Sequence, residues 1–444
     1  MNCTKPGIRD ILLKKIINRE IVAGVLGLGY VGLPLAVEIA KAGFRTLGFD
    51  VKKEKADSVN HGHSYIADVD NSDLKVLVER GTLAATTDFS EIRKVDFVVV
   101  CVPTPLDERR QPDISHVEEA VKSIARYLHK SMVVVLESTS YPGTTEELVK
   151  PILESTGLKC GEDFYLGFSP ERVNPGGAIY KVKSIPKVTA GLGAAAGEVI
   201  SAMYEAVLEN KVFRASSPSV AEMAKMLENS YRSVNIGLIN EFAIFCNERG
   251  IDIWEVIEAA KTKPFGFAPF SPGPGLGGHC IPVDPCYLNY KASTYGFRFS
   301  MIDASMAVND RMPEYCVGRI SEILGRRLGK SVNSSRILVL GIAYKPDIDD
   351  CRESPAIRII GRLRASGADT VFYDPYIMQF HYHGKVYEGE RSLTARLVQS
   401  VDMVVITTSH SKVDYEFVRG HAKVVFDTRN ATKGLADRSN IELL

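Results

Sequence analysis

The sequence lacks the cysteine patterns that mark disulfide-bonded or zinc-binding proteins. Its eight cysteines are scattered over 444 residues, without a CxxC pair and without a metal-like cluster with histidine. We therefore expect free thiols, no disulfide framework and no bound metal. The cysteines are Cys3, Cys101, Cys160, Cys246, Cys280, Cys286, Cys316 and Cys351.

The sequence also lacks long apolar runs and any excess of charge. Its longest apolar stretches, such as FVVVCV, are only long enough for a strand, and the first residues, MNCTKPGIRDILLKKIINRE, carry charges throughout, unlike a signal peptide. The 54 basic residues balance 54 acidic ones. These absences predict a cytoplasmic globular protein without nucleic-acid or membrane partners.

A glycine-rich turn near the start has the sequence context of a dinucleotide site. The apolar run 21–26 enters GLGYVG, the segment PLAVEIAKAG is typical of a helix, and FRTLGFD predicts a second strand that closes on Asp50. The motif GxGxxG alone is weak evidence, but a strand before it, a helix after it and an acid further on make the prediction strong.

Each residue of this motif has a physical reason. Gly27 permits the tight turn, Gly29 lets the backbone approach a pyrophosphate, and Gly32 lets the helix pack on the strand. The helix N-terminus favours the anion. Asp50 is expected to accept hydrogen bonds from ribose hydroxyls and to repel a 2′-phosphate, which favours NAD over NADP.

Further strand and helix patterns alternate on both sides of a helical region. VDFVVVCVPTP and SMVVVLESTS predict strands that end at Thr104 and at Thr139, where open parallel sheets place ligands. After Pro313 a helical segment leads into a second set of strands, RILVLGIAY, DTVFYDP, VDMVVITTSH and AKVVFDTRN. The C-terminal third is therefore expected to form a second open parallel sheet.

A long helix is predicted between the two sheets. From about Ser217 to Gly250, apolar residues recur at helical spacing over roughly 45 Å at 1.5 Å per residue, so the helix is expected to connect domains or build a dimer interface. Lys225 and Asn229 are four residues apart and share one face of it. Taken from the helix alone, Lys225 is more simply interpreted as a solvated surface lysine.

The segment PGPGLGGHCIPVDP, residues 272–285, is an unusual setting for a cysteine. Glycines and prolines leave little side chain for packing around Cys280, so backbone can approach a ligand closely. Asp284 follows four residues later, and we expect the thiol and the carboxylate to leave the same loop, a pairing that acyl chemistry can use.

Together these segments resemble the UDP-glucose/GDP-mannose dehydrogenase family. GLGYVGLPLA, CVPTP, ESTSYPGT, SPERVNPG, AKMLENSYR, PGPGLGGHCIPVDP and GIAYKPDIDDCRESPA look like the sequence blocks of that family, and they occur in its order from residue 21 onward. The resemblance implies an α/β fold with two Rossmann-like, doubly wound parallel-sheet domains joined by a long central helix. It implies four segments: an N-terminal extension (1–19), an NAD-binding domain (20–205), a central helical domain for dimerisation and catalysis (206–312) and a C-terminal domain that binds a UDP-sugar (313–444).

The resemblance also implies a chemistry that explains Cys280. The family oxidises the C6 alcohol of a nucleotide sugar to a carboxylate with NAD, in four electrons, through a thiohemiacetal and a thioester on a cysteine. By resemblance Lys225 stabilises an oxyanion, Asn229 holds a water or the C6 oxygen, and Asp284 is the general base. Glu171 and Thr139 match positions that serve the hydrolytic step.

Further positions are carried over as binding residues. The cofactor positions are Gly27, Gly29, Tyr30, Val31, Gly32, Asp50, Thr104 and Thr139. The substrate positions are Glu171, Arg172, Val173, Lys225, Asn229, Phe270, Gly277, Gly278, Lys345 and Arg352. Lys345 resembles a UDP-contacting lysine, whereas Arg352 is equally well interpreted as a substrate contact or as a structural ion pair. Cys286 is interpreted as packing, and His279 as steric filling beside the nucleophile.

The sugar is the least constrained part of the prediction. Residues 261–280 look like the branch of the family that oxidises UDP-N-acetylhexosamines, especially UDP-N-acetylglucosamine, with UDP-glucose as the alternative and UDP-N-acetylmannosamine or UDP-N-acetylgalactosamine as further ones. Phe265, Phe267 and Phe270 could pack an acetamido methyl or the uracil, although three phenylalanines in a loop are by default a satellite core. A homodimer or a higher assembly is expected. A two-electron dehydrogenase and a non-catalytic NAD-binding scaffold remain as other classes.

Overall fold

A computed structural model describes residues 7–66, 68–172, 184–278 and 280–444 of the chain. It divides into two compact units, the first formed by residues 1–228 and 286–296 and the second by residues 229–285 and 297–444. Two helices run from one unit into the other, and each unit is described separately below. No helix among the described residues has the length and apolar character needed to cross a membrane.

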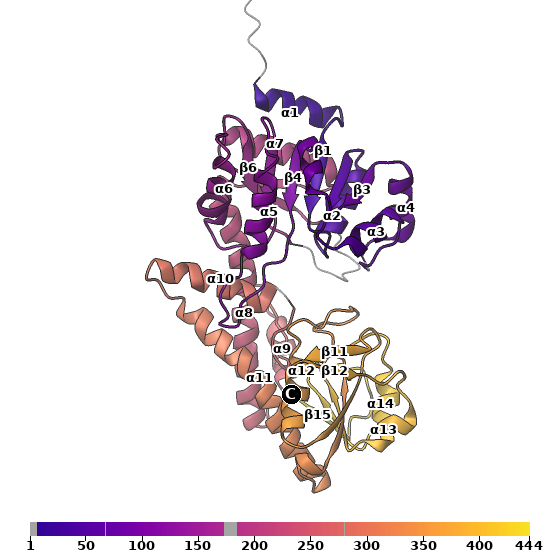
Figure 1. Ribbon diagram of the computed structural model, residues 1–444. Coiled ribbons are helices and arrows are strands. Elements are labelled where there is room, and N and C mark those ends of the chain that lie inside the picture. Colours follow the sequence, from indigo (N-terminus) through magenta and orange to yellow (C-terminus); the bar gives the residue numbers. More distant parts are fainter. Residues whose placement is uncertain (1–6, 67, 173–183, 279) are drawn as a thin grey trace, which may run out of the picture. The chain divides into compact units, whose positions relative to one another are not determined.

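The first unit is built on an eight-stranded sheet (Figure 1, indigo to magenta). Its strand order is β3-β2-β1-β4-β5-β6-β7-β8, and all neighbouring pairs are parallel except β6 with β7. The strands are β1 (Val22–Leu26), β2 (Arg45–Phe49), β3 (Leu83–Thr86), β4 (Phe97–Val100), β5 (Val133–Leu136), β6 (Tyr165–Phe168), β7 (Lys187–Gly191) and β8 (Val212–Arg214).

Helices cover both faces of this sheet because both faces are apolar. Along β4, Phe97 and Val99 point into one core and Val98 and Val100 into the other, which is the two-residue alternation of a fully buried strand. The helices are α1 (Ile8–Ile17), α2 (Gly32–Lys41), α3 (Lys53–Asn60), α4 (Asn71–Glu79), α5 (Ser115–Ala125), α6 (Lys150–Glu154) and α7 (Ala194–Val207), with 3-10 turns at Phe89–Lys94 and a π-helical turn at Thr145–Val149.

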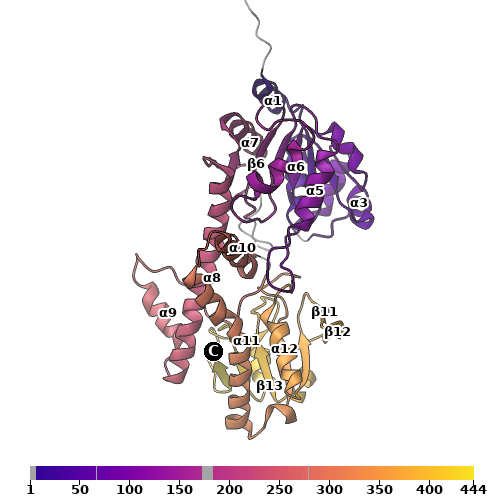
Figure 2. The same cartoon turned by 60° about the vertical axis from the view of Figure 1, so that its left-hand side comes forward.

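The second unit contains a five-stranded parallel sheet of order β10-β9-β13-β14-β15 and a separate hairpin, β11-β12. Figure 2 shows α11 and α12 side by side along this sheet. The elements are β9 (Arg336–Leu340), β10 (Asp369–Tyr373), β11 (Gln379–Tyr382), β12 (Lys385–Glu388), β13 (Met403–Ile406), β14 (Val425–Asp427), β15 (Ile441–Leu443), α9 (Ile253–Lys261), α11 (Ser300–Leu328), α12 (Pro355–Ala365), α13 (Ala395–Ser400) and α14 (Tyr415–His421).

Two helices connect the units along the chain. The predicted long helix is present as α8 (Pro218–Glu248), with 31 residues, and α10 (Cys280–Thr294) is the other. The helix expected after Pro313 begins earlier, because α11 starts at Ser300 and runs through that proline. Its buried face, which includes Ile302 and Ile320, continues on both sides of Pro313, so packing outweighs the hydrogen bond that proline cannot make. The fold class with two Rossmann-like sheets and a long central helix is confirmed.

Candidate active site

The glycine turn between β1 and α2 has the geometry that the sequence predicts. Gly27 has a φ of +92°, and a Cβ there would overlap the carbonyl of Cys101, so only glycine fits. A Cβ on Gly32 would overlap the carbonyl of Gly27, whereas Gly29 faces open space. The turn thus leaves room at Gly29 for a pyrophosphate at the start of α2, and Tyr30 and Val31 complete the turn.

Asp50 lies directly after β2 and is buried beside this turn. Its carboxylate accepts hydrogen bonds from the backbone N–H groups of Leu28 and Lys52, each at 3.0 Å, and from the Nζ of Lys55 at 3.0 Å. Lys55 was not singled out from the sequence. Thr104, on the loop after β4, is also buried. The turn, the open space and the acid together fit a bound dinucleotide.

Lys225 is buried, so the interpretation as a solvated surface lysine is wrong. Only 3% of Lys225 is exposed, and its Nζ donates a 2.7 Å hydrogen bond to the hydroxyl of Thr139, which follows β5. The helical spacing alone gave no sign of burial, because it could not tell which face of α8 meets the sheet. A buried ammonium at the carboxyl end of β5 is suited to stabilise negative charge on a ligand there.

A buried glutamate that the sequence analysis did not single out holds the loop after Thr139. Glu222, three residues before Lys225 on α8, accepts from the N–H of Gly143 at 2.6 Å, the N–H of Thr145 at 3.0 Å and the hydroxyl of Thr145 at 2.7 Å. Burial raises the pKa of Glu222, and these hydrogen bonds oppose the increase. The same helix therefore carries Lys225, which contacts Thr139, and Glu222, which anchors the loop that follows Thr139.

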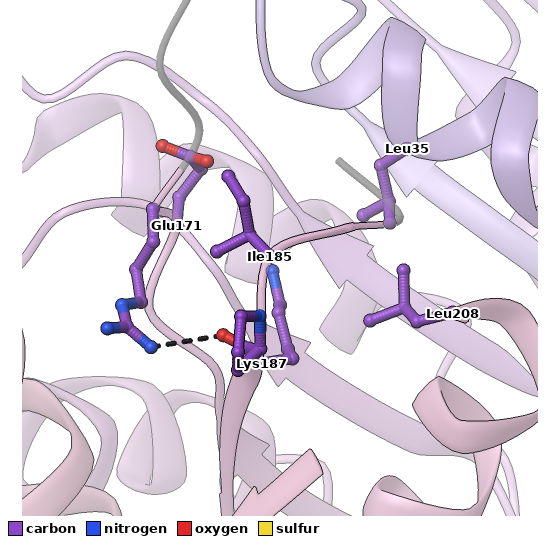
Figure 3. A pocket seen from close by; sticks show the side chains of 7 residues that line it. Leu35, Glu171, Ile185, Lys187 and Leu208 are labelled. Atoms are coloured by element: carbon purple, nitrogen blue, oxygen red, sulfur yellow. Dashed lines mark hydrogen bonds between the residues drawn. The ribbon is translucent and has the colours of Figure 1, made fainter. Parts of the chain in front are cut away.

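Glu171 and Arg172 line a small pocket after β6 (Figure 3). Arg172 pairs with Glu228 at 2.8 Å and donates to the carbonyl of Pro186 at 3.0 Å. Val173, predicted as a substrate contact, lies outside the described residues. The other residues that line the pocket are Leu35, Ile185, Pro186, Lys187 and Leu208.

An ion pair missed by the sequence analysis lies at the edge of this pocket. Lys187 contacts the carboxylate of Glu137 at 3.0 Å, and the hydroxyl of Tyr204 donates to the same carboxylate. Glu137 is buried and immediately precedes Ser138 and Thr139. The three partners are 50 and 17 residues apart in sequence, so no local pattern indicates that they meet.

Cys280 lies at the start of a helix, which corrects the expectation that it sits with Asp284 in a loop. Cys280 is the first residue of α10 and is half-buried, and Asp284 lies one turn further along the same helix. A helix N-terminus stabilises a thiolate, because the unpaired N–H groups of the first turn carry partial positive charge. The glycines therefore end before Cys280, whereas Pro282 and Pro285 lie within the helix that begins there.

Asp284 and Asn229 are hydrogen-bonded to each other. Asp284 is fully buried, and the amide nitrogen of Asn229 donates to its Oδ2 at 2.6 Å. Two residues that were assigned separate roles, one on α8 and one on α10, thus meet directly. The amide holds the carboxylate in place, as a positioned general base requires.

The glycines before Cys280 pack against the loop that follows β9. A side chain on Gly277 would overlap the Cβ of Tyr344, and one on Gly278 would overlap its ring. The N–H of Gly278 donates to the carbonyl of Arg352 at 3.0 Å. These glycines are therefore required for a close approach between two loops, in addition to any approach of a substrate. Their common neighbour is the loop that carries Lys345, which is half-buried.

Arg352 forms the ion pair that was one of its two interpretations. Its Nε and Nη2 bind the carboxylate of Asp350 at 3.0 Å and 2.7 Å, and its backbone N–H donates to the same group. This places Arg352 within the fold of its own loop.

The aromatic set after α9 is not a satellite core. Phe265 and Phe267 are 71% and 39% exposed, so that default interpretation is wrong for both of them. Phe270 is half-buried, and its ring meets Tyr231 edge to face, with centroids 5.7 Å apart. Apart from the two phenylalanines, the segment 262–269 (TKPFGFAP) contains no large apolar side chain, so it offers them few apolar neighbours.

Arg429 is a further cation that the sequence analysis missed. It follows β14, donates from Nε to the carbonyl of Thr407 at 2.9 Å, and lies so close to Gly273 that a Cβ there would overlap its guanidinium. Desolvation lowers the pKa of Arg429 to about 10. A desolvated cation at the carboxyl end of a parallel strand suits an anionic ligand, and the signal in the sequence was an arginine directly after a predicted strand.

The other described cysteines are poorly suited to nucleophilic attack. Burial raises the pKa of Cys160 to about 11 and that of Cys316 to about 12, and it also raises the pKa of Cys101 and Cys351. The described cysteines form no disulfide, and Cys286 is buried inside α10, in agreement with a packing role. No cluster of potential metal ligands occurs among the residues described, and His279 lies outside them.

These features define a class of enzyme, the dinucleotide-dependent dehydrogenases. The chain belongs to the UDP-glucose/GDP-mannose dehydrogenase family. The NAD binding domain of that family matches residues 21–208, its central domain matches 219–311, and its UDP binding domain matches 338–434. The protein is thus an NAD-dependent nucleotide-sugar dehydrogenase, and the predicted family and cofactor are confirmed.

Named relatives in this family differ in their sugar. The chain is 38% identical to a UDP-N-acetyl-D-glucosamine 6-dehydrogenase from Pseudomonas aeruginosa, over 89% of this chain and 92% of the relative. A UDP-D-ManNAc dehydrogenase from Pyrococcus horikoshii has a similar structure, with 32% identity, a TM-score of 0.86 and coverage of 95% and 99%. A UDP-glucose dehydrogenase from Pyrobaculum islandicum follows, with 26% identity, a TM-score of 0.81 and coverage of 95% and 96%.

Proposed function

We propose that the protein oxidises the C6 hydroxyl of UDP-N-acetylglucosamine to a carboxylate, in four electrons and through covalent intermediates on Cys280. The observation that carries the proposal is the thiol at the first residue of α10, with Asp284 one turn further along that helix and hydrogen-bonded to Asn229 on α8. The choice of sugar rests on the 38% identity to the Pseudomonas aeruginosa enzyme.

Bound NAD supplies the hydride acceptor for both oxidations, held by the turn from Gly27 to Gly32 and by Asp50, with Thr104 and Thr139 at neighbouring strand ends. Lys225 stabilises the oxyanion at C6, and Asp284, assisted by Asn229, takes the hydroxyl proton. This first oxidation leaves an aldehyde.

The thiolate of Cys280 then adds to the aldehyde carbon, the carbonyl oxygen takes up a proton, and the tetrahedral thiohemiacetal keeps the C–H bond from which a second hydride can leave. Loss of that hydride and of the hydroxyl proton gives a thioester. Water, positioned by Glu171 and Thr139, attacks the thioester carbon, and cleavage of the C–S bond releases the carboxylate and the thiol. Lys345 binds the diphosphate, and Arg172, Val173, Phe270, Gly277, Gly278 and Arg352 are proposed as further substrate contacts.

A second sugar is favoured by specific observations. Relatives named UDP-N-acetyl-D-mannosamine dehydrogenase are 31–35% identical over 87–92% of the chain, so UDP-N-acetylmannosamine is the other candidate. UDP-N-acetylgalactosamine and UDP-glucose complete the set of sugars for comparison, and the sugar with the highest kcat/KM identifies the substrate.

The proposed assembly is a homodimer or a higher oligomer. Large apolar side chains are exposed at helical spacing along α8, and a second copy of the chain is the occupant that would bury them in both partners. They are Val220, Met223, Leu227, Tyr231, Leu238, Phe242 and Phe245.

The deciding experiment is the end-point yield of NADH per limiting UDP-sugar with NAD in excess. We expect two NADH per sugar, and Cys280→Ser should lose the second NADH. The matched control is Cys160→Ser, which changes another half-buried thiol and should keep both. One NADH from the unmodified protein would indicate a two-electron dehydrogenase, and so would full turnover by Cys280→Ser. No NADH from any of the four sugars would favour an NAD-binding scaffold.

A further inference from the structure

The loop after β13 contains a buried histidine that none of the preceding roles uses. His410 is fully buried, and both of its ring nitrogens have polar partners. Its Nε2 lies 3.0 Å from Oδ2 of Asp374, which follows β10, and its Nδ1 lies 3.0 Å from the backbone nitrogen of Asp347, on the loop after β9. His410 therefore connects the ends of three strands.

The two partners determine which nitrogen carries the proton. The backbone N–H of Asp347 can only donate, so Nδ1 must be the acceptor, and Nε2 must then donate to Asp374. Burial raises the pKa of Asp374, but hydrogen bonds from His410 and from the backbone of Ala343 outweigh this effect and hold the pKa below its ordinary value. The ring is thus a neutral imidazole that donates one hydrogen bond to Asp374 and accepts one from Asp347.

The two partners of His410 differ in how much they depend on it. The carboxylate of Asp374 stays satisfied without the histidine, because it also accepts from four backbone N–H groups, those of Ile342, Ala343, Tyr376 and Ile377. The N–H of Asp347, by contrast, has the Nδ1 of His410 as its acceptor. The histidine consequently matters more to the loop after β9 than to the acid after β10.

Asp347 needs such support because its backbone is in an unfavourable conformation. Its φ is +61°, in the left-handed region that non-glycine residues seldom adopt. Besides the bond to His410, its Oδ1 accepts from the N–H of Ser411 at 2.9 Å and from the hydroxyl of Tyr376 at 3.3 Å. These contacts tie the turn to the ends of β13 and β10.

The same loop carries groups of the proposed site. Lys345 lies two residues before Asp347, and Tyr344 and Arg352 contact Gly278 as described above. A change at Asp347 would therefore displace the proposed phosphate contact and disturb the packing of the glycines that precede Cys280.

We propose that His410 is a positioning residue for the UDP moiety: through Nδ1 it holds Asp347, and with it the Lys345 loop, in the conformation that binds UDP. This inference rests on the proposed function, in which Lys345 contacts the diphosphate.

Two single substitutions separate this role from general stability. In His410→Asn the amide oxygen can occupy the place of Nδ1 and still accept from Asp347, whereas the donor to Asp374 is lost. In His410→Gln the amide nitrogen can occupy the place of Nε2 and still donate to Asp374, whereas the acceptor for Asp347 is lost. Each variant removes one hydrogen bond and part of a buried ring, so we expect a similar decrease in Tm for both.

The measurement is the Kd of UDP by calorimetry, with the Kd of NAD in a second titration. We expect His410→Gln to raise the Kd of UDP about fivefold to tenfold, which corresponds to one lost hydrogen bond, and His410→Asn to stay within about twofold of the unmodified protein. The Kd of NAD should change in neither variant. The inference would be overturned if both variants weakened UDP binding equally, or if neither weakened it.

A milder variant decides the question if neither histidine variant folds. Tyr376→Phe removes only the hydroxyl that donates to Asp347, and we expect it to weaken UDP binding about twofold to threefold. Tyr387→Phe, whose ring stacks on Phe380, is the control and should bind as before. An unchanged Kd in Tyr376→Phe would then count against the inference. Absence of UDP binding by the unmodified protein would overturn the proposed function, and this inference with it.

Discussion

Lys225 shows how the surroundings of a side chain determine its role. On the helix alone it could equally be a surface lysine, yet in the fold it is almost fully buried against Thr139. A cation in such a place loses hydration, which strengthens its interaction with a developing negative charge. Its contribution should therefore appear mainly in the rate of the chemical step.

The corresponding prediction is that Lys225→Met lowers kcat by about 10²- to 10³-fold, the usual cost of removing one stabilising donor from an oxyanion. Methionine keeps the length of the side chain and removes its charge. The matched control is Lys122→Met, on the exposed face of α5, which should change kcat less than about twofold. Steady-state kinetics with saturating NAD check the prediction, and an unaltered kcat for Lys225→Met would exclude the assigned role.

The residues that the sequence predicted and those that it missed differ in the range of their contacts. The glycine turn, Asp50 and Cys280 are recognisable because the motifs that identify them consist of residues close together in the sequence. Glu222 meets a loop about 77 residues away in sequence, and His410 meets Asp347 across 63 residues. Such pairs depend on how strands are ordered in the sheet, which a single sequence does not state.

At the level of whole elements, α8 and the loop after β5 are held together by one carboxylate. Glu222 has three donors on that loop, at Gly143 and Thr145, and all lie in the interior. An amide in its place would direct an NH₂ group toward at least one of these donors. The loop begins beside Thr139, so its anchoring also supports the partner of Lys225.

We therefore expect Glu222→Gln to destabilise the protein by about 1–3 kcal/mol, the range for an unsatisfied buried polar group. The Tm should decrease accordingly. Glu228→Gln, on the same helix and in an exposed ion pair with Arg172, serves as the control and should change stability by less than about 1 kcal/mol. If the two substitutions lowered the Tm equally, Glu222 would not be the residue that anchors the loop after β5.

A second acid joins several elements at the N-terminal ends of the strands in the second unit. Asp402, just before β13, pairs with Lys330 and Lys423 at 2.8 Å and 2.9 Å and accepts from the backbone N–H of Arg336. Burial raises the pKa of Asp402, but these partners outweigh it and lower the pKa to about 2. Because the folded value lies below the ordinary 3.8, ionised Asp402 stabilises the fold above about pH 4, and this stabilisation is lost as the pH falls toward 2.

Asp402→Asn should thus lower the Tm at pH 7, and its difference from the unmodified protein should shrink as the pH is lowered from about 4. The control is Asp369→Asn, which removes an exposed partner of Arg336 and should have little effect at any pH. Thermal melts between pH 3 and pH 7 test this directly. A difference that stays constant over that range would show that the charge of Asp402 is not responsible.

The elements themselves were more predictable than their ends. The apolar spacing of α8 and the strand and turn order of both sheets follow from local periodicity, which survives in any arrangement of the chain. Pro313 misled the prediction, because proline usually ends a helix, and the burial that carries α11 through it comes from α12 and the sheet. Cys280 was likewise assigned to a loop because the glycines before it and the prolines on both sides of it are more visible in sequence than the helix that begins at Cys280.

For the molecule as a whole, the exposed face of α8 sets an expectation for assembly. Leu238→Asp combined with Phe242→Asp should convert the proposed oligomer to a monomer, since two charges would be buried in the new interface without partners. Sedimentation velocity at working concentration measures this. Val256→Asp, a half-exposed apolar position on α9, is the comparison and should leave the assembly intact. A monomeric unmodified protein would contradict the proposed dimer.

The two sheets repeat one local design, with different outcomes. Gly27 and Gly341 both have a φ of +92°, and in each case the next residue donates its N–H to an acid after the neighbouring strand, Asp50 or Asp374. Asp50 has three hydrogen-bond donors, whereas Asp374 has five, more than the roughly four sites of a carboxylate. The carboxylate of Asp50 thus keeps capacity for a further donor such as a ribose hydroxyl, whereas that of Asp374 is fully used within the fold.

In the proposed reaction, the NAD-binding domain must release one reduced cofactor and bind a fresh NAD before the second oxidation. The half-oxidised sugar must stay bound during that exchange, and its covalent bond to Cys280 prevents the release of a reactive aldehyde.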